Sequence, residues 1–294
     1  MVQPSLCQIR KPLLHSPIDL PDGRAVFLAP AKEIRKLDER CITYTWLSRR
    51  MLFGEVYRRL LPDYFESMPH NSGVMISSFI RAAEIVPGLT FPGDIDVLVI
   101  PYENDELVLS NTLAVEIKIV RASFIRQGKS PNQFGFSQAK ALLAAGFPYV
   151  AVGHLITSDR SPSNAWRDVG VTKIIDADTG AVGPIRFIKY DMLPEDLLRR
   201  SHGRLSRNCS DQLLGYFSAY PGSQGIWSPI GKSSDFNPCT KMSTLEGVYK
   251  YYQKNFQYFL WTRRFPPSHP VSISEAKQIK LFEQMREKMR RDFP

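Results

Sequence analysis

Residues 91–118 read F-P-G-D-I-D-V-L-V-I-P-Y-E-N-D-E-L-V-L-S-N-T-L-A-V-E-I-K, and they hold the most informative pattern in the chain. The second half contains an apolar run, 113–119, that is interrupted by two charges, Glu116 and Lys118. Strand side chains alternate between two faces, so these two charges share one face and the apolar residues around them share the other. Charges in such a run are costly to bury unless they are paired or bind a metal ion. The pattern therefore predicts a strand that carries a functional site.

Another strand is predicted before this one in the chain, and acidic residues stand at its start. Asp94 and Asp96 precede the apolar residues 97–100, and the polar segment 102–106 supplies a turn that lets the two strands lie side by side. This hairpin brings Asp96 next to both charges of the second strand. Two carboxylates and one ammonium group at one end of a hairpin form a site for a small, hard cation.

The same residues resemble the PD-(D/E)XK phosphodiesterase superfamily, which has the restriction-endonuclease-like fold. The match is Asp96 in G-D-I-D, followed twenty residues later by Glu116-Ile117-Lys118. A helix that carries Gln138 and a buried strand over 149–154 then follow, as is usual in that superfamily. The resemblance covers residues 73–156.

The resemblance implies an α/β fold with a restriction-endonuclease-like core, in which helices flank a central mixed sheet. It implies that Asp96 and Glu116 hold Mg²⁺, with Mn²⁺ able to substitute, and that the Ile117 carbonyl completes the protein ligands. Lys118 then orients or deprotonates the attacking water, or stabilises negative charge on the phosphate. The expected activity is Mg²⁺-dependent hydrolysis of phosphodiester bonds by an endonuclease, with DNA favoured as the substrate.

Three further residues are auxiliary candidates. In many members of the superfamily the helix before the hairpin supplies an extra acid, and Glu55 is the only acid in the second half of the predicted helix 31–61. Glu55 also lies almost opposite the apolar stripe of that helix, where a solvated glutamate belongs, so both interpretations are open. Asp94 is expected on the same side of its strand as Asp96. Gln138 either faces the active site or lies on the helix surface.

Composition limits the compartment and the class of protein. With 43% hydrophobic residues in 294, the chain can bury one large core or two smaller ones. No window approaches eighteen uninterrupted apolar residues, and the N-terminus has no apolar signal-peptide core. We therefore expect a soluble, cytoplasmic protein with no membrane partner. The four cysteines lie far apart and are expected to be reduced thiols.

Three regions are predicted: an N-terminal arm over 1–30, a nuclease-like core over 31–190, and a basic, mainly helical region over 191–294. Residues 187–294 hold 17 Lys and Arg against ten Asp and Glu, so +7 of the formal charge of +9 lies there. This asymmetry suits a polyanionic partner such as a nucleic acid, with DNA favoured. An ordinary basic protein is the alternative.

Basic residues in three segments are predicted to contact the nucleic acid. One group lies in the loop after Lys118, one lysine lies on the helix that follows the loop, and four arginines lie on a helix predicted over 197–216. Each could instead be a solvated surface group or pair with an acid. The residues are Arg121, Arg126, Lys129, Lys140, Arg199, Arg200, Arg204 and Arg207.

Two C-terminal helices are predicted as well. The helix over 245–261 carries aromatic residues at three- and four-residue steps with cations between them. Such aromatics can stack on bases, although this spacing more often forms a core-facing stripe. A capping box of Ser272 and Glu275 opens a final amphipathic helix over 273–291 that is expected to dock on a partner or on the body of the protein.

A second function remains open beside the nuclease. The same fold also serves without catalysis, as a DNA-binding or scaffold module of a nucleic-acid-processing or defence complex. In that case the basic C-terminal part would carry the function. A duplex cut on both strands usually requires two active sites, so a homodimer or a larger protein complex is open in either case.

Overall fold

The computed structural model describes residues 9–14, 38–69, 72–176, 179–222 and 227–263. The chain forms two compact units, one of residues 1–161 with 192–265 and the other of 162–191 with 266–294. The first unit holds the central sheet and its helices. In the part of the chain described here, no helix combines the length and the apolar character that a membrane span requires.

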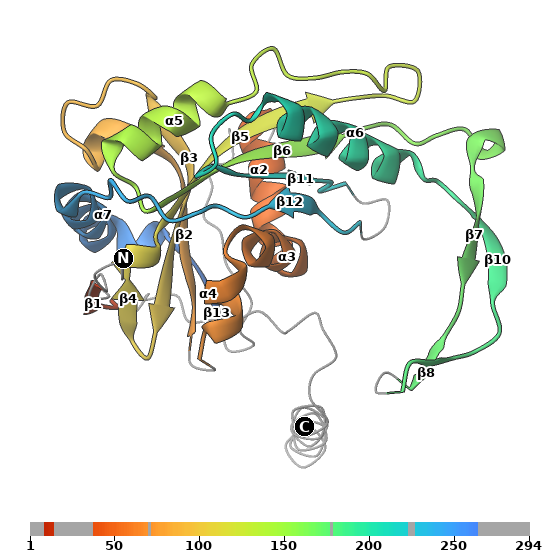
Figure 1. Ribbon diagram of the computed structural model, residues 1–294, viewed down its shortest axis with the longest axis horizontal. Helices are drawn as coiled ribbons and strands as arrows, with labels where there is room; N and C mark the ends of the chain where they lie inside the picture. The colour runs from red at the N-terminus through yellow and green to blue at the C-terminus, as the bar shows by residue number, and fades with distance from the viewer. Residues whose placement is uncertain (1–8, 15–37, 70–71, 177–178, 223–226, 264–294) are drawn as a thin grey trace. The chain divides into compact units, whose positions relative to one another are not determined.

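The described part of the first unit contains a nine-stranded mixed sheet (Figure 1). The path runs in the order β1-β4-β3-β5-β6-β11-β12, and β2 lies off this path, between β3 and β13. The β5–β6 and β6–β11 pairs are parallel and the other pairs are antiparallel. The strands are β1 (Arg10–Pro12), β2 (Ser72–Arg81), β3 (Asp94–Glu103), β4 (Glu106–Val108), β5 (Leu113–Arg121), β6 (Tyr149–Thr157), β11 (Gly215–Ala219), β12 (Ile230–Lys232) and β13 (Leu260–Arg263).

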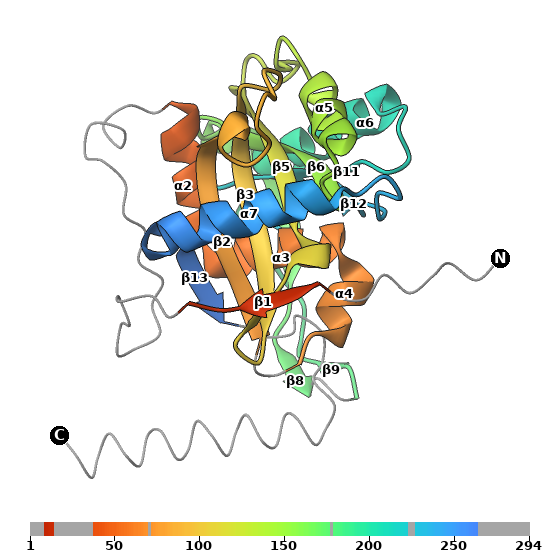
Figure 2. The same ribbon diagram turned by 90° about the vertical axis from the view of Figure 1, so that its left-hand side faces the viewer.

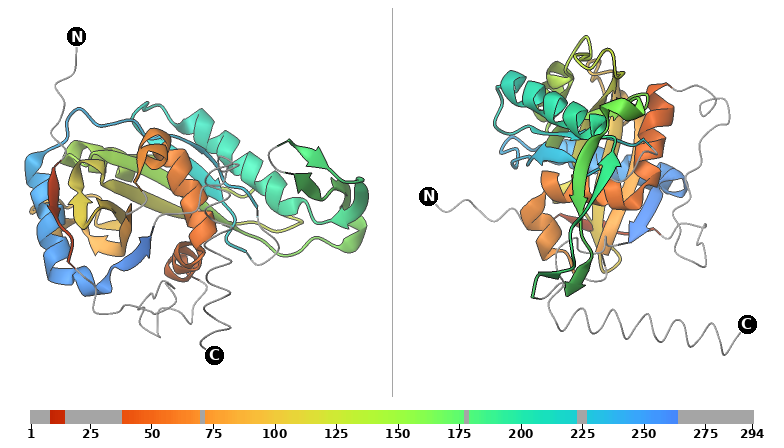
Figure 3. Two further views of the ribbon diagram at one scale, coloured as in Figure 1. Left: turned by 90° about the horizontal axis from the view of Figure 1, so that it is seen from below. Right: turned by 90° about the vertical axis from the view of Figure 1, so that its right-hand side faces the viewer.

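Helices cover both faces of this sheet. α2 (Glu39–Ser48), α3 (Arg50–Leu60) and α4 (Pro62–Ser67) supply buried residues to the cluster on one face. α5 (Phe136–Ala145) and α7 (Met242–Asn255) pack on the other face, where α7 crosses in front of the strands (Figure 2). α6 (Leu193–Asn208) runs beside β6 and β11 (Figure 3). The molecule is thus α/β, with a central mixed sheet flanked by helices, as predicted.

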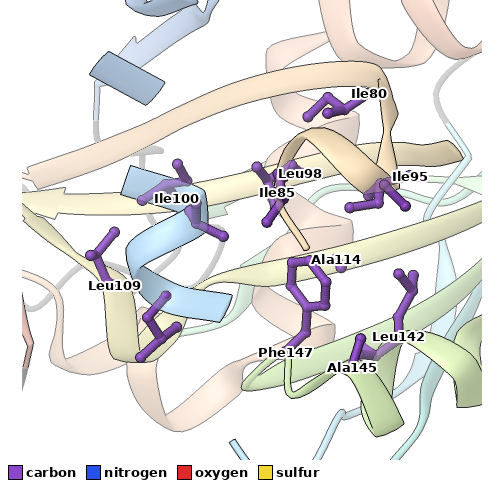
Figure 4. Packing of buried hydrophobic residues seen from close by; sticks show 14 of the residues in the cluster. Ile80, Ile85, Ile95, Leu98, Ile100, Leu109, Ala114, Leu142, Ala145 and Phe147 are labelled. Atoms are coloured by element: carbon purple, nitrogen blue, oxygen red, sulfur yellow. The ribbon is translucent and has the colours of Figure 1, made fainter. Parts of the chain in front are cut away.

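Alternation along β3 and β5 separates the two cores. Val97 and Val99 pack with the α2–α3 cluster, as do Val115 and Ile117 of β5. The residues between them face α5 and α7, where Leu98, Ile100 and Ala114 join Leu142, Ala145 and Phe147 (Figure 4). Burial of both faces explains why these strands read as apolar runs. Glu116 and Lys118 alternate with Val115 and Ile117, so they share one face of β5, as the pattern predicted, and this face is the α5 side.

The helix that carries Gln138 and the strand over 149–154 are present as predicted. The two strands of the predicted hairpin pair as β3 and β5, but β4 and the 3₁₀ helix η2 (Leu109–Asn111) lie between them, so the segment 102–106 is not a simple turn. α5 ends at Gly146, whose φ of 96° gives the left-handed C-cap that glycine accepts without strain. α5 also provides the crossover that the parallel β5–β6 pair requires.

Several predicted boundaries were wrong. The apolar residues 82–86 favour a further strand of the sheet, but they begin with the 3₁₀ helix η1 (Ala82–Glu84) and continue as a turn. The described part of the helix predicted over 31–61 is broken at Arg49, whose ψ of 80° is not helical. The helix predicted over 197–216 ends at Asn208, and the apolar residues after it form β11.

The chain after residue 190 was predicted to form a separate region. It instead contributes strands to the central sheet. β11 pairs in parallel with β6 and antiparallel with β12, and β13 pairs with β2. The aromatic stripe of α7 faces the core, since Tyr252 is fully buried and its ring lies 5.2 Å from that of Phe259. The stripe is thus the core-facing one that its spacing favours. The final helix predicted over 273–291 lies outside the described residues.

The described part of the second unit is an antiparallel ribbon. β7 (Arg167–Val171) pairs with β10 (Arg186–Tyr190), and β8 (Ile174–Asp176) pairs with β9 (Ala181–Val182) (Figure 3).

Candidate active site

Asp96 and Glu116 lie where the pairing of β3 with β5 ends. The last pair is Val97 with Val115, and the two acids are the next residues in that register. Beyond it, β3 continues beside β2 and β5 continues beside β6, so the sheet opens between them. The backbone amide of Ile117 donates to Asp96 Oδ2 at 2.7 Å. A carboxylate thus satisfies the backbone donor at this opening.

Lys118 completes the predicted triad. Its Nζ donates to Glu116 Oε1 at 2.6 Å, and the exposed fractions of the Lys118 and Glu116 side chains are 19% and 2%. The other oxygen, Glu116 Oε2, is buried and has no hydrogen-bond partner among the described residues. A buried acceptor without a partner is uncommon and costly. It leaves one carboxylate oxygen available to a ligand.

The charge of Glu116 disfavours the charge of Asp96, whereas a hydrogen bond with Asp96 lowers the pKa of Glu116. Burial, and after it the negative charge of Glu116, raises the pKa of Asp96 from 3.8 to about 8, against the lowering effect of the Ile117 amide. Burial likewise raises the pKa of Glu116, although Lys118 opposes that shift. Burial lowers the pKa of Lys118, but the hydrogen bond and charge of Glu116 outweigh it and raise the pKa overall. The site therefore stabilises added positive charge, supplied by a proton or a cation.

Glu39 is an acid of this site that the sequence analysis missed. It is the first residue of α2, after the N-cap Asp38, whose side chain accepts the Cys41 amide at 3.0 Å. The negative charge of Glu39 contributes to the raised pKa values of both Asp96 and Glu116. Burial raises the pKa of Glu39 itself, while nearby Lys118 opposes this. An acid in the first turn of a helix is common, so its position carried no separate signal.

Glu55, the acid proposed from the sequence, has a different environment. It lies on α3, where its Oε2 is 3.3 Å from Arg58 Nη2 on the next turn. The break at Arg49 gives α2 and α3 separate axes. The acid that approaches the triad is therefore Glu39 of α2, and not the candidate Glu55 of α3. Asp94 is exposed and lies opposite Arg81 of β2.

The start of α5 lies directly against the triad. Gly135 has a φ of 90°, and a Cβ added there would lie 3.0 Å from Glu116 Cγ and 3.5 Å from Lys118 Cγ. Glycine is thus required by both the backbone and the space. Gln138 lies in the first turn of this helix with its Oε1 buried and unpartnered among the described residues. The positive N-terminal end of α5 therefore lies close to the carboxylates.

His154 is a second residue that the sequence did not reveal. It lies beside Lys118 in the parallel β5–β6 register and is fully buried. Its Nδ1 is 3.0 Å from Ser201 Oγ on α6, and its Nε2 is 3.4 Å from the carbonyl oxygen of Phe134. Burial lowers its pKa to about 4, so the ring is neutral at physiological pH. A neutral ring with both nitrogens engaged ties α6 and the loop before α5 to the sheet.

The predicted basic residues fall into distinct groups. Arg200, Arg204 and Arg207 share one face of α6. Burial lowers the pKa of Arg204, and the positive charges of Arg200 and Arg207 lower it further. Arg204 Nη2 donates to the Lys129 carbonyl at 2.8 Å, which connects this face to the loop after β5. Arg199 instead pairs with Glu195 at 2.8 Å.

The remaining basic residues lie around the same loop. Arg121, at the end of β5, is exposed, and its charge acts on Glu39. Arg126 and Lys129 are exposed on the loop, and Lys140 Nζ of α5 donates to Ser210 Oγ at 3.1 Å. We call Arg200, Arg204, Arg207 and Lys129 the α6 basic face.

Hard carboxylate oxygens with one unpartnered acceptor suit Mg²⁺. Within the residues that the structure describes, no three His, Cys, Asp or Glu side chains gather tightly enough to hold a metal ion. A cation held by Asp96 and Glu116 would therefore take most of its remaining ligands from water, as Mg²⁺ commonly does. Comparison with protein-family models, curated proteins and solved structures finds no match to this chain.

Proposed function

We propose that this chain is a metal-dependent endonuclease with a restriction-endonuclease-like core and that DNA is its favoured substrate. The observation that carries the proposal is that the buried carboxylate of Glu116 and the half-buried carboxylate of Asp96 lie opposite each other at the opening between β3 and β5, with Lys118 hydrogen-bonded to Glu116. A structural ion pair needs only one acid for one lysine. The second acid, with its raised pKa, is costly to the fold unless it serves a ligand.

Mg²⁺ would be held by Asp96, by Glu116 and by the Ile117 carbonyl, with Glu39 adding negative potential from α2. Bound there, it would supply a water of low pKa and polarise the scissile phosphate. The unpartnered Glu116 Oε2 supports this assignment, because it is the one oxygen of the Glu116 carboxylate that the lysine leaves open. Glu39 is better suited to an outer role, through water, than to direct ligation, since the three acids do not form one tight cluster.

Lys118 would act as a fixed positive charge. Its raised pKa keeps the ammonium protonated at neutral pH, which favours stabilisation of negative charge on the phosphate over removal of a proton from water. Its partly exposed side chain can contact a bound phosphate without breaking the pair with Glu116. The interpretation of Lys118 as a general base is correspondingly weaker.

The α6 basic face would hold the substrate backbone. Arg204 reaches the loop that leads into α5, and Ser201, one turn earlier, contacts His154 beside Lys118. A row of cations that begins one strand away from the triad can bind phosphates on either side of the reacting one. Such contacts position a nucleic acid without reading its sequence.

Cleavage of a supercoiled plasmid and of a short RNA, each with Mg²⁺, with Mn²⁺ and with EDTA, tests the proposal. We expect plasmid cleavage that requires the metal and that Glu116→Gln abolishes. Asp94→Asn is the matched control, since Asp94 is an exposed acid of the same strand as Asp96. Nucleic-acid binding without cleavage under all metal conditions would favour the alternative, a catalytically silent binding module.

A further inference from the structure

The ribbon of the second unit exposes an unusual amount of apolar surface. None of the side chains described in 162–176 and 179–190 is buried. Five of the exposed large apolar side chains are exposed by more than half: Ile174 by 64%, Ile175 by 68%, Val182 by 53%, Ile185 by 63% and Phe187 by 75%. Single exposed apolar residues are ordinary, but a group of them on one thin element marks a contact surface.

One face of the ribbon is flat and apolar at its centre. Phe187 of β10 lies opposite Gly170 of β7. A Cβ at Gly170 would lie 3.2 Å from Ile185 Cγ2 and 3.7 Å from Phe187 Cε1, so both apolar side chains extend over the glycine. The next pair on this face is Lys189 with Asp168, whose charged groups are 3.2 Å apart. We call this surface the Gly170 face.

A two-stranded ribbon of this kind lacks the burial that makes a sheet stable. Isolated hairpins are marginal in water, and independent stability needs further strands or a packed helix on an apolar face. Among the described residues, β7 and β10 form a sheet of two strands only. An exposed apolar face on so small a sheet favours association with another protein surface.

Charge indicates what that surface is. Residues 162–191 contain four Lys and Arg and four Asp, a formal charge of zero in a chain of +9. A neutral, apolar ribbon has no net attraction for a nucleic acid, whereas it avoids the repulsion that opposes contact between two basic bodies. A surface with an apolar centre and a border of one acid and one base can face a copy of itself, which suits a two-fold dimer.

We propose that the ribbon 162–191 is a dimerisation arm, and that its Gly170 face packs on the same face of a second copy of this chain. Phe187 and Ile185 supply the apolar centre, and Asp168 and Lys189 form a neutral border. The inference goes beyond the proposed nuclease activity and does not depend on it, because it concerns a part of the chain that holds none of the site residues.

The mass of the full-length protein in solution, measured by light scattering over a wide concentration range, tests this proposal. We expect wild type to have twice the chain mass and Ile185→Ser/Phe187→Ser to have the chain mass. The control, Met242→Ser/Tyr258→Ser, removes two apolar residues of the first unit that are 55% and 60% exposed, and it should stay dimeric. A monomeric wild type, a dimeric arm variant, or loss of the dimer in the control would overturn the proposal.

Hydrogen exchange on wild type provides a readout that does not depend on whether the variant folds. Amides of β7 and β10 should be protected at concentrations where the dimer forms, and they should lose that protection on dilution. Amides of the central sheet should be protected under both conditions. Protection of the ribbon that does not change between dimer and monomer would contradict the assignment of the interface to the arm.

Discussion

Asp96 Oδ2 accepts the backbone amide of Ile117 at 2.7 Å, so the acid of β3 is tied to the residue between Glu116 and Lys118. This bond spans the opening between two strands that no longer pair. It fixes the separation of the two carboxylates by a contact with the backbone, whose position does not depend on side-chain rotamers. The site is consequently formed before any ligand binds, although the burial of two like charges costs stability.

The first prediction concerns Asp96→Asn. The amide oxygen can still accept the Ile117 amide, whereas the negative charge needed by a cation is lost. We expect metal-dependent cleavage to fall by more than a hundredfold, as is typical when charge stabilisation is removed, and we expect the melting temperature to be unchanged or raised. Single-turnover cleavage and thermal unfolding measure the two effects. Full activity would refute the role of Asp96 as a ligand.

The second prediction concerns pH and follows from the raised pKa of Asp96. Between pH 3.8 and about 8 Asp96 holds a proton in the folded protein that it has lost in the unfolded chain, so its contribution to the free energy of unfolding falls as pH rises through this range. The lowered pKa of His154 acts in the opposite direction below pH 6.5, but it does so in wild type and in Asp96→Asn alike. We expect the free energy of unfolding of wild type, relative to that of Asp96→Asn, to fall by about 1 to 3 kcal/mol between pH 5 and pH 8. Urea unfolding without metal at pH 5 and pH 8 measures it.

Mg²⁺ should stabilise the folded protein most at a pH at which the carboxylates are ionised. A bound cation replaces the proton, so added Mg²⁺ should raise the melting temperature more at pH 8 than at pH 5. Asp96→Asn should lack this difference. An equal Mg²⁺ effect in wild type and variant would place the cation elsewhere on the protein.

The third prediction separates the two roles considered for Lys118. Lys118→Met keeps the length of the side chain but removes the charge. We expect nucleic-acid affinity to change by less than about threefold, because one cation contributes little to an interface of many contacts, while kcat falls steeply. Binding to a duplex in Ca²⁺ and cleavage in Mg²⁺ are the two measurements. Equal losses in both would show that Lys118 is an ordinary phosphate contact.

The fourth prediction tests Glu39, the acid that only the structure revealed. Outer groups of a metal site typically contribute 10- to 100-fold in metal affinity. Glu39→Gln should therefore raise the Mg²⁺ concentration needed for half-maximal cleavage by about tenfold, with a smaller change at saturating Mg²⁺. Glu55→Gln is the matched control and should behave as wild type, since Glu55 pairs within its own helix.

The fifth prediction concerns the α6 basic face. Arg200 and Arg207 are exposed, so Arg200→Ala/Arg207→Ala should lower the slope of log affinity against log salt by about two for a duplex substrate. The loss should appear in KM more than in kcat. Arg199→Ala on the same helix is the control, because Arg199 already pairs with Glu195. An unchanged slope would show that α6 has a purely structural role.

Several features were decided by the local sequence alone. The pleat of a strand has a period of two, so the shared face of Glu116 and Lys118 followed from their spacing and from the apolar residues around them. Apolar runs bounded by turn residues located the hairpin of β3 and β5, and the glycine after the apolar helix located the end of α5. Each of these inferences depends on residues close together in the chain.

The tertiary structure alone decided which distant residues join that hairpin. Glu39, Gly135 and His154 reach the triad through the packing of α2, α5 and β6, and no spacing within the sequence encodes such an approach. Glu55 was left open as an auxiliary acid because it is the only acid in the second half of the helix predicted over 31–61. The non-helical ψ at Arg49 divides that helix, and Glu39 of α2 is the acid whose charge acts on the triad. Periodicity reports the face of one element at a time, whereas the residues around a site depend on where several elements meet, and that is fixed only when the cores pack.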